Sequence, residues 1–424
     1  MLRDACITGT THIMTGEYTT TQNGGMAPKT VALVDWSWIG HHPTYFCLFT
    51  KSLLKLGLNV RALCPKPEEV SRSLADLPEN VQERLFLERL PGWASAPRGT
   101  PDRWKSIVGT ARSLRVLDRM LRRGPQQPDL VFFACIYDWQ FYHFGTFRHW
   151  FRWKWAGLYL QSFGFRSTTS PIYAWHRQWA KPQKVLRQGT PAAIATLDEG
   201  ISKQLQAVIH PGKCVVFPDI TNTAMPEAGE STLAGKLRCF AAGRPIVLLS
   251  GALFPQRGVY AFLQAAMANP QWCFALAGDL ACLSDNEKDR SLLDEFLRKH
   301  PCSFCHPLRL QDGPVYNSLV AVSDVIWNIH LDWPGSSNTL TKAALFEKPV
   351  VVGEGHLLAE RTREFRLGEV CCEDSITSIS KALHAILDSP ESWKSSQAPR
   401  WRDYTAAHSE QQLDRALSEL IASL

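Results

Sequence analysis

The sequence contains no uninterrupted run of about 18 apolar residues, the length that a membrane-spanning helix requires. Its first residues include no long apolar core, so we predict no secretory signal. No period of about 20 to 50 residues repeats along the chain, which argues against a solenoid of repeats. These absences favour an ordinary globular protein, for which we predict a cytoplasmic location.

The net charge is small for the length of the chain. A formal charge of +6 over 424 residues permits anionic ligands. A nucleic-acid-binding protein is expected to concentrate its basic residues on one face, and the overall charge gives no case for that, so we predict no nucleic-acid partner. The 12 cysteines are scattered, and Cys135, Cys214 and Cys273 lie in apolar runs, which is typical of reduced core cysteines.

Short apolar runs alternate with helix-length stretches in two series. Continuous apolar runs are typical of strands covered on both faces, as in parallel sheets, and their alternation with helices indicates βαβ units. The chain is long enough for two domains. We therefore predict an α/β fold with two facing Rossmann-like, doubly wound domains. The predicted strands are 31–36, 60–64, 130–135, 157–160, 192–196 and 214–217, then 246–250, 273–277, 325–329 and 350–352.

Composition changes along the chain suggest its division. A Thr- and Gly-rich start is predicted to be a disordered tail, and a segment that opens with Pro, Gly, Ser and Thr is predicted to link the domains. The last segment has apolar residues on one helical face. The predicted units are the tail 1–27, the N-terminal domain 28–220, the linker 221–244, the C-terminal domain 245–395 and a final helix in 396–424.

The loop after the first predicted strand reads "GHHPTYF". Gly40 would let the backbone approach a ligand, and Pro43 suits the first turn of a helix. His41 and His42 are candidates for proton transfer or for contact with hydroxyl groups. The alternative is that one histidine caps the helix and the other is exposed.

Two further loops could bind an anion. In "SGALFPQRGVYAFLQA", a strand ends at Gly251, and Arg257 precedes a helix, where its planar guanidinium could hold a diphosphate. In "GSSNTLTKAALFEKPVVV", residues 335–339 start a helix with small and hydroxyl side chains, which leaves backbone N–H groups for an anion. A surface arginine and a plain Ser or Asn helix cap are the respective alternatives.

In this order, the three quoted stretches resemble the retaining GT-B glycosyltransferases of the large family-4 group, over residues 30 to 390. The resemblance implies a nucleotide-diphosphate sugar donor on the C-terminal domain and a hydroxyl acceptor, glycan or lipid-linked, on the N-terminal domain. It also implies a final helix that crosses back to the N-terminal domain, and no metal cofactor. A catalytically inactive relative that binds nucleotide or glycan as a partner subunit, and a sugar-nucleotide epimerase, are the alternatives.

The resemblance departs from the family motifs at several positions. The basic pair falls at Ala252 and Arg257, the two glutamates fall at Pro334 and Lys342, and the usual histidine after the fourth strand is missing, with Asp138 the nearest polar group. Lys342 either supplies the charge missing at Ala252 or is solvated. The candidate residues are His41, His42 and Asp138 for catalysis, Gly40 and His41 for the acceptor-side loop, and Gly251, Arg257, Gly335, Ser336, Ser337, Asn338, Thr339 and Lys342 for the donor.

Residues 147–155, "FRHWFRWKW", interleave basic and aromatic side chains. One interpretation is a peripheral contact with a membrane interface, where Trp lies at the level of the headgroups and Arg or Lys meets phosphates. The other is the exposed end of a helix that leads into a strand.

Overall fold

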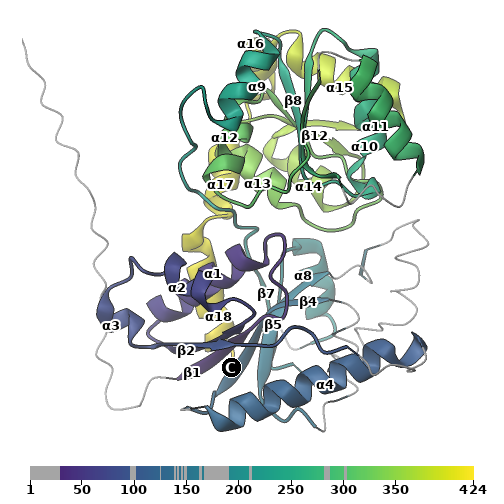
Figure 1. Ribbon diagram of the computed structural model, residues 1–424. Helices are drawn as coiled ribbons and strands as arrows, with labels where there is room; N and C mark the ends of the chain where they lie inside the picture. Colours follow the sequence, from purple (N-terminus) through teal and green to yellow (C-terminus); the bar gives the residue numbers. More distant parts are fainter. Residues whose placement is uncertain are drawn as a thin grey trace, which may run out of the picture.

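The structure is a computed structural model. It describes residues 29–95, 102–124, 126–137, 140, 143–144, 147, 150–161, 165–166, 191–209, 213–280, 287–299 and 303–424. Two α/β domains follow one another, and the end of the chain returns to the first (Figure 1). The predicted tail 1–27 lies outside the described residues.

The N-terminal domain is built on a parallel sheet of seven strands in the order β3-β2-β1-β4-β5-β6-β7. β1 lies between β2 and β4, so the sheet extends in both directions from its first strand, as in Rossmann folds. Its strands are β1 Thr30–Val34, β2 Asn59–Cys64, β3 Leu85–Arg89, β4 Leu130–Tyr137, β5 Trp155–Gln161, β6 Ala193–Thr196 and β7 Cys214–Val216. Its helices are α1 His42–Lys55, α2 Pro67–Ser73, α3 Glu79–Gln82, α4 Asp102–Arg123 and α8 Glu199–Gln206.

The C-terminal domain repeats this plan with a parallel sheet of six strands in the order β10-β9-β8-β11-β12-β13. Its strands are β8 Ile246–Ala252, β9 Cys273–Asp279, β10 Ser303–His306, β11 Val325–Trp327, β12 Val350–Gly353 and β13 Gly368–Cys371. Its helices are α9 Leu233–Ala241, α10 Val259–Ala268, α11 Glu287–Lys299, α12 Pro314–Val322, α13 Asn338–Leu345, α14 His356–Phe365, α15 Ile376–Leu387 and α16 Pro390–Gln397, with the 3-10 turn η2 Pro255–Arg257.

The predicted strands all occur, and the described strands absent from the predicted set are β3, β10 and β13. All three lie at a sheet edge, where one side of the strand has no neighbour and a continuous apolar run is not required. The predicted linker 221–244 is too long. Its second half forms α9, whose Ala234 and Leu237 are buried in the core of the C-terminal domain.

A buried arginine in the middle of β2 joins that strand to the end of α4. The Arg61 side chain is fully buried and pairs with Glu88 of β3 at 2.7 Å. Its guanidinium also donates to the carbonyl oxygens of Met120, Leu121 and Gln126, at 2.8 to 3.1 Å. These carbonyls belong to the last turn of α4 and the residues after it; that of Met120 also accepts from the Gly124 N–H at 3.1 Å. Arg61 therefore serves as a C-terminal cap of α4.

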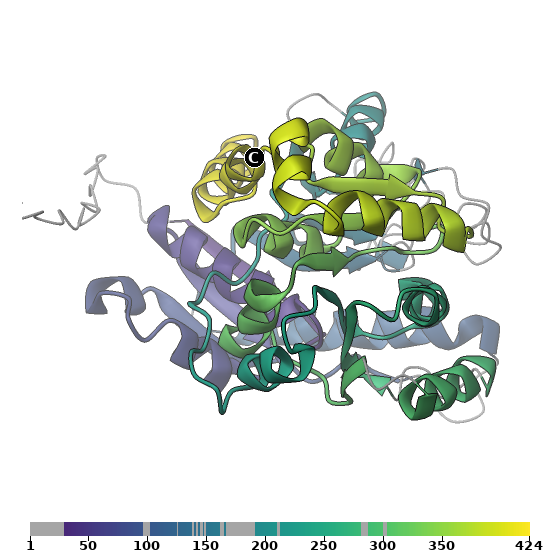
Figure 2. The same cartoon turned by 90° about the horizontal axis from the view of Figure 1, so that it is seen from above.

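The end of the chain crosses between the domains, as predicted, but as two helices. α17 Trp401–Ala407 buries Tyr404 in the C-terminal core, and α18 Glu410–Ala422 buries Leu413, Leu417 and Leu420 in the N-terminal core. Figures 1 and 2 both show the yellow C-terminal helix beside the purple start of the chain. Ion pairs join Lys51 to Glu410 and Lys55 to Asp414, at 2.9 and 3.2 Å.

Of the described helices, none is both long enough and apolar enough to cross a bilayer. Cys135, Cys214 and Cys273 are free and buried, as predicted. Within residues 147–155, Phe147, Phe151 and Trp155 are core residues, so these three aromatics are not available to a membrane interface. Among the described residues of this stretch, Trp150, Arg152 and Lys154 are exposed and Trp153 is half-buried.

Candidate active site

The two domains meet through the loops that follow their strands. Thr44 at the start of α1 donates to Asp312 of the loop after β10, at 3.2 Å. Gly40, with a φ of +64°, lies against Arg309 of the same loop, since a Cβ at position 40 would lie 3.6 Å from its guanidinium. The carboxyl ends of parallel strands are where open α/β sheets bind ligands, so both sheets present their ligand-binding edges here.

Asp219, just after β7, connects four parts of the molecule. Its carboxylate accepts from Tyr45 of α1 at 2.7 Å and from Ser336 of the loop before α13, and it lies 4.0 Å from Arg361 of α14. Its backbone N–H donates to His408 Nδ1 at 2.9 Å. Burial, with the nearby carboxylate, raises the pKa of Tyr45 well above its usual value. No local motif in the sequence marks Asp219, because its hydrogen-bond partners lie 117 to 189 residues away along the chain.

Arg257 lies at the end of β8 and is held by two hydrogen bonds. Its guanidinium donates to the carbonyl of Ser250 and to His330 Nε2, each at 2.7 Å. The Nε–H group is buried and has no hydrogen-bond partner among the described residues. Burial and the adjacent cation lower the pKa of His330 well below its usual value, so the imidazole is neutral and accepts. His330 was not predicted, although it directly follows the predicted strand 325–329.

A chain of polar contacts leads from Arg257 to the start of α13. Asn328 Oδ1 accepts from Ser337 Oγ at 3.0 Å and lies 3.2 Å from His330 Nε2, which is a contact and not a hydrogen bond because Nε2 accepts from Arg257. Ser337 occupies the N-cap position of α13, yet its side chain makes no capping hydrogen bond. The predicted alternative of a plain serine cap is therefore wrong at this position. The N–H groups of the first helical turn have no earlier helical carbonyl to bind.

On the N-terminal domain, three side chains from β1, α1 and β4 form a line. His42 Nδ1 lies 2.8 Å from Asp35 Oδ2, and His42 Nε2 lies 2.5 Å from the hydroxyl of Tyr137. Asp35 and His42 are buried, whereas Tyr137 is partly exposed. Burial raises the pKa of Tyr137, so the phenol stays protonated and donates to His42. The carboxylate then accepts from the other ring nitrogen, which holds the imidazole in one tautomer.

Asp35, His42 and Cys135 lie close enough together to share a metal ion. Both nitrogens of His42 are already engaged by Asp35 and Tyr137. Burial also raises the pKa of the Cys135 thiol well above its usual value. In the structure Asp35 and His42 belong to the hydrogen-bonded line with Tyr137.

Solved structures share this architecture. HepE of Anabaena, in complex with UDP and glucose, aligns over 94% of this chain and 100% of its own, with a TM-score of 0.65 and 14% identity. Sucrose-phosphate synthase of Thermosynechococcus elongatus aligns over 93% and 98%, with a TM-score of 0.65 and 15% identity. WaaG, a glycosyltransferase involved in lipopolysaccharide biosynthesis, aligns over 92% and 99%, with a TM-score of 0.61 and 12% identity. The protein has the GT-B fold. No family model and no curated protein matches the sequence.

Within this GT-B fold, several predicted donor residues are engaged elsewhere. The Asn338 side chain accepts from Thr221 at 3.0 Å and donates to the carbonyl of Ile220. Lys342 is completely buried and pairs with Asp312 at 2.7 Å, besides donating to Asn317. The alternative of a solvated Lys342 is therefore wrong, and the ammonium group is paired with the Asp312 carboxylate. That Lys342 supplies the charge missing at Ala252 stays a prediction.

The remaining predicted residues stand as follows. Gly251 has a φ of +105°, and a Cβ there would lie 3.6 Å from Arg257. A Cβ at position 335 would lie 3.1 Å from the ring of Trp333, whose indole N–H donates to the carbonyl of Ser336. Thr339 is buried in the first turn of α13. Asp138 lies outside the described residues.

His41 lies beside the line formed by Asp35, His42 and Tyr137, between the two domains. Its ring contacts those of His42 and Tyr45, with centroids 5.8 and 5.4 Å apart. Burial and the neighbouring His42 lower the pKa of His41 to about 4, so it is neutral at neutral pH. A neutral imidazole can donate to or accept from a sugar hydroxyl.

Proposed function

We propose that the protein is a glycosyltransferase that moves a sugar from a nucleotide-diphosphate donor to a hydroxyl group of a glycan or lipid-linked acceptor. One observation carries the proposal: a guanidinium and an uncapped helix start are joined through His330 and Asn328 at the ligand-binding edge of the second sheet. The GT-B architecture supports it, since HepE has also been solved with UDP-glucose.

The chemistry of the leaving group explains this arrangement. Transfer breaks the bond between the anomeric carbon and the diphosphate, which leaves with negative charge. A fixed cation and the positive end of a helix stabilise such charge in a site from which water is excluded. Arg257 remains protonated, and its Nε–H, which has no partner among the described residues, can donate a hydrogen bond to a phosphate oxygen. These groups would serve without a divalent ion, so we expect activity to survive EDTA.

The line from Asp35 through His42 to Tyr137 is proposed to act on the acceptor. The phenolic oxygen of Tyr137 donates its proton to His42 and can still accept from an acceptor hydroxyl. As the acceptor oxygen attacks, its proton would move to Tyr137 while the phenolic proton moves to His42. Asp35 would then stabilise the imidazolium. Because the sequence motifs resemble those of retaining glycosyltransferases, we also propose that the anomeric configuration is retained. NMR of the first product formed would show its anomeric configuration.

We expect Tyr137→Phe to lower kcat by about 100-fold, the usual contribution of a general base, with little change in donor affinity. The ring and its packing are kept, so only the hydroxyl is lost. Steady-state kinetics and donor titration by calorimetry measure the two effects. Tyr260→Phe on α10 is the matched control and should behave as wild type. An unchanged kcat in Tyr137→Phe would contradict the proposal that Tyr137 takes part in proton transfer.

A nucleotide-sugar screen tests the function itself. Thermal shift with UDP, GDP and ADP and their sugars should identify one nucleotide that stabilises the protein, and donor hydrolysis or transfer should follow with that nucleotide sugar. No stabilisation and no turnover with any donor would overturn the proposal.

A second candidate function is a non-catalytic, nucleotide-binding subunit. The absence of both family carboxylates favours it, because the side chain of Pro334 has no hydrogen-bond donor or acceptor for a sugar hydroxyl and Lys342 is paired with Asp312. Tight donor binding without hydrolysis or transfer, across glycan and lipid-linked acceptors, would select this candidate. An epimerase would instead convert the donor sugar with no acceptor present.

A further inference from the structure

The net charge of the chain is concentrated on one helix. α4 contains seven Lys and Arg residues and two Asp residues among 22, a net charge of +5, whereas the whole chain carries +6. The composition alone therefore conceals a strongly basic surface. α4 covers the side of the N-terminal sheet away from the C-terminal domain (Figure 1), so this charge is remote from Arg257.

The basic residues are arranged in two neighbouring rows. At 100° per residue, Lys105, Arg112, Arg119 and Arg123 fall within about 40° of one another, and Arg115 and Arg122 form the adjacent row. All six side chains are exposed. We call them the α4 basic face. Arg122 pairs with Asp118 of the same helix at 2.9 Å.

Exposed tryptophans flank the α4 basic face. Trp104, in the row of Arg115, is 48% exposed, and Trp150 is 49% exposed. The guanidinium of Arg115 lies 4.5 Å from the ring centre of Trp150, and that of Arg122 lies 5.9 Å from the ring centre of Trp153. The stretch 150–153 therefore lies against α4 and extends its surface. Tryptophan beside arginine is the combination that suits the headgroup region of a bilayer.

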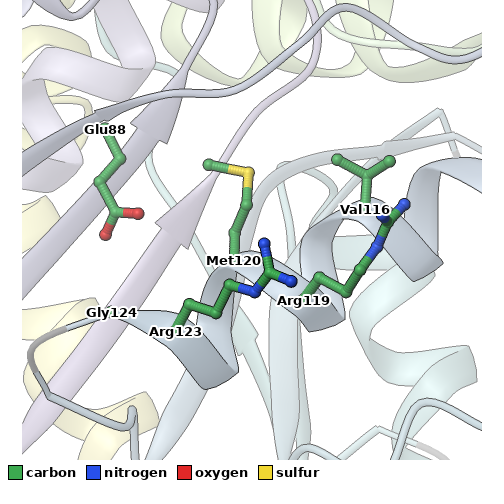
Figure 3. Close-up of a pocket in the computed structure, with 6 residues that line it drawn as sticks. All are labelled: Glu88, Val116, Arg119, Met120, Arg123 and Gly124. Atoms are coloured by element: carbon green, nitrogen blue, oxygen red, sulfur yellow. The ribbon is translucent and has the colours of Figure 1, made fainter.

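A cavity of about 390 Å³ opens at the end of this face. Figure 3 shows Val116, Met120, Arg119 and Arg123 extending from α4, with Glu88 of β3 on the other side. The charge of Glu88 is already paired with Arg61. The cavity therefore combines the apolar side chains of Val116 and Met120 with two arginines that have no ion pair within the described residues, which suits a phosphate attached to an apolar chain.

We propose that the α4 basic face and Trp150 dock the protein on an anionic phospholipid bilayer. The concentrated positive charge complements the lipid phosphates, and each basic residue close to such a surface contributes about 1 kcal/mol, or roughly fivefold in affinity. The apolar cavity and the exposed indoles favour a bilayer over a nucleic-acid backbone, which needs only the charge. The inference does not depend on the proposed transferase activity.

Vesicle co-sedimentation tests the proposal with the full chain at about 0.1 M salt. We expect binding to phosphatidylglycerol mixed with phosphatidylcholine, and none to phosphatidylcholine alone. Replacing Arg112, Arg119 and Arg123 together by Glu should reduce binding at least tenfold, and the same three changes to Gln should reduce it less. In the matched control, Lys236, Arg238 and Arg298 are replaced together by Glu. These three residues are exposed on the C-terminal domain, and the change in net charge is the same.

Trp150→Ala should weaken vesicle binding severalfold while leaving any salt-dependent binding to polyanions unchanged. Circular dichroism and thermal unfolding establish that the variants are folded. Equal losses in the α4 triple variant and the control variant would mean that net charge alone acts, which overturns the proposal. So would failure of the wild type to bind anionic vesicles, or tighter binding to RNA or duplex DNA than to vesicles.

Discussion

Arg257→Ala is expected to reduce kcat/KM for the nucleotide sugar by about 100-fold or more, the range found when one charge-stabilising donor is removed from an active site. The guanidinium is held by Ser250 and His330, and its Nε–H has no partner among the described residues. An alanine removes both the charge and the planar fork. Arg257→Lys keeps the charge without the fork and should recover part of the activity.

The readout for this variant must separate binding from folding. Calorimetric titration with the nucleotide diphosphate measures the loss of affinity, and thermal unfolding without ligand checks the fold. Arg298→Ala on α11 is a suitable control because its side chain is exposed and bonds only to its own helix. Diphosphate binding by Arg257→Ala at the wild-type affinity would separate Arg257 from the donor site while leaving the fold assignment intact.

Arg61→Ala is expected to destabilise the N-terminal domain by about 3 kcal/mol, at the lower end of the cost of breaking a buried ion pair, because Glu88 remains partly solvated. The carbonyl groups of Leu121 and Gln126 would also lose the guanidinium donor, whereas that of Met120 would keep the Gly124 N–H. For a domain of this size the unfolding temperature should fall by about 6 to 12 °C. Scanning calorimetry, which can resolve the two domains, is the measurement.

The control for Arg61 is an exposed pair on the next strand. Arg89 pairs with Glu68 at 2.8 Å, and both side chains are more than half exposed. Arg89→Ala should therefore cost well under 1 kcal/mol. Replacing Arg61 by Met and Glu88 by Gln together should recover part of the loss, since the pair is removed without leaving a charge. An Arg61→Ala protein as stable as Arg89→Ala would show that α4 needs no such cap.

The strands were predictable where they are buried on both faces. β1 and β8 are continuous apolar runs because a central strand of a covered parallel sheet must be apolar on both sides. β3 and β13, "LFLER" and "GEVC", lie at the edges and carry charged residues, so no run marks them. The predicted linker was too long because its first half is polar, and α9 in its second half was not recognised as a separate helix.

The sequence by itself determined approximately where the central strands lie, and therefore that Gly40, Arg257 and residues 335–339 follow strands at the carboxyl edges of the two sheets. It could not determine which partner each side chain meets. Tyr137 reaches His42 only because β4 lies beside β1, and Lys342 meets Asp312 only because α13 packs near the loop after β10. Strands and helices can be predicted because their hydrophobic periodicity involves residues that are close in sequence. These contacts depend instead on the order of the strands and on the packing of the two domains.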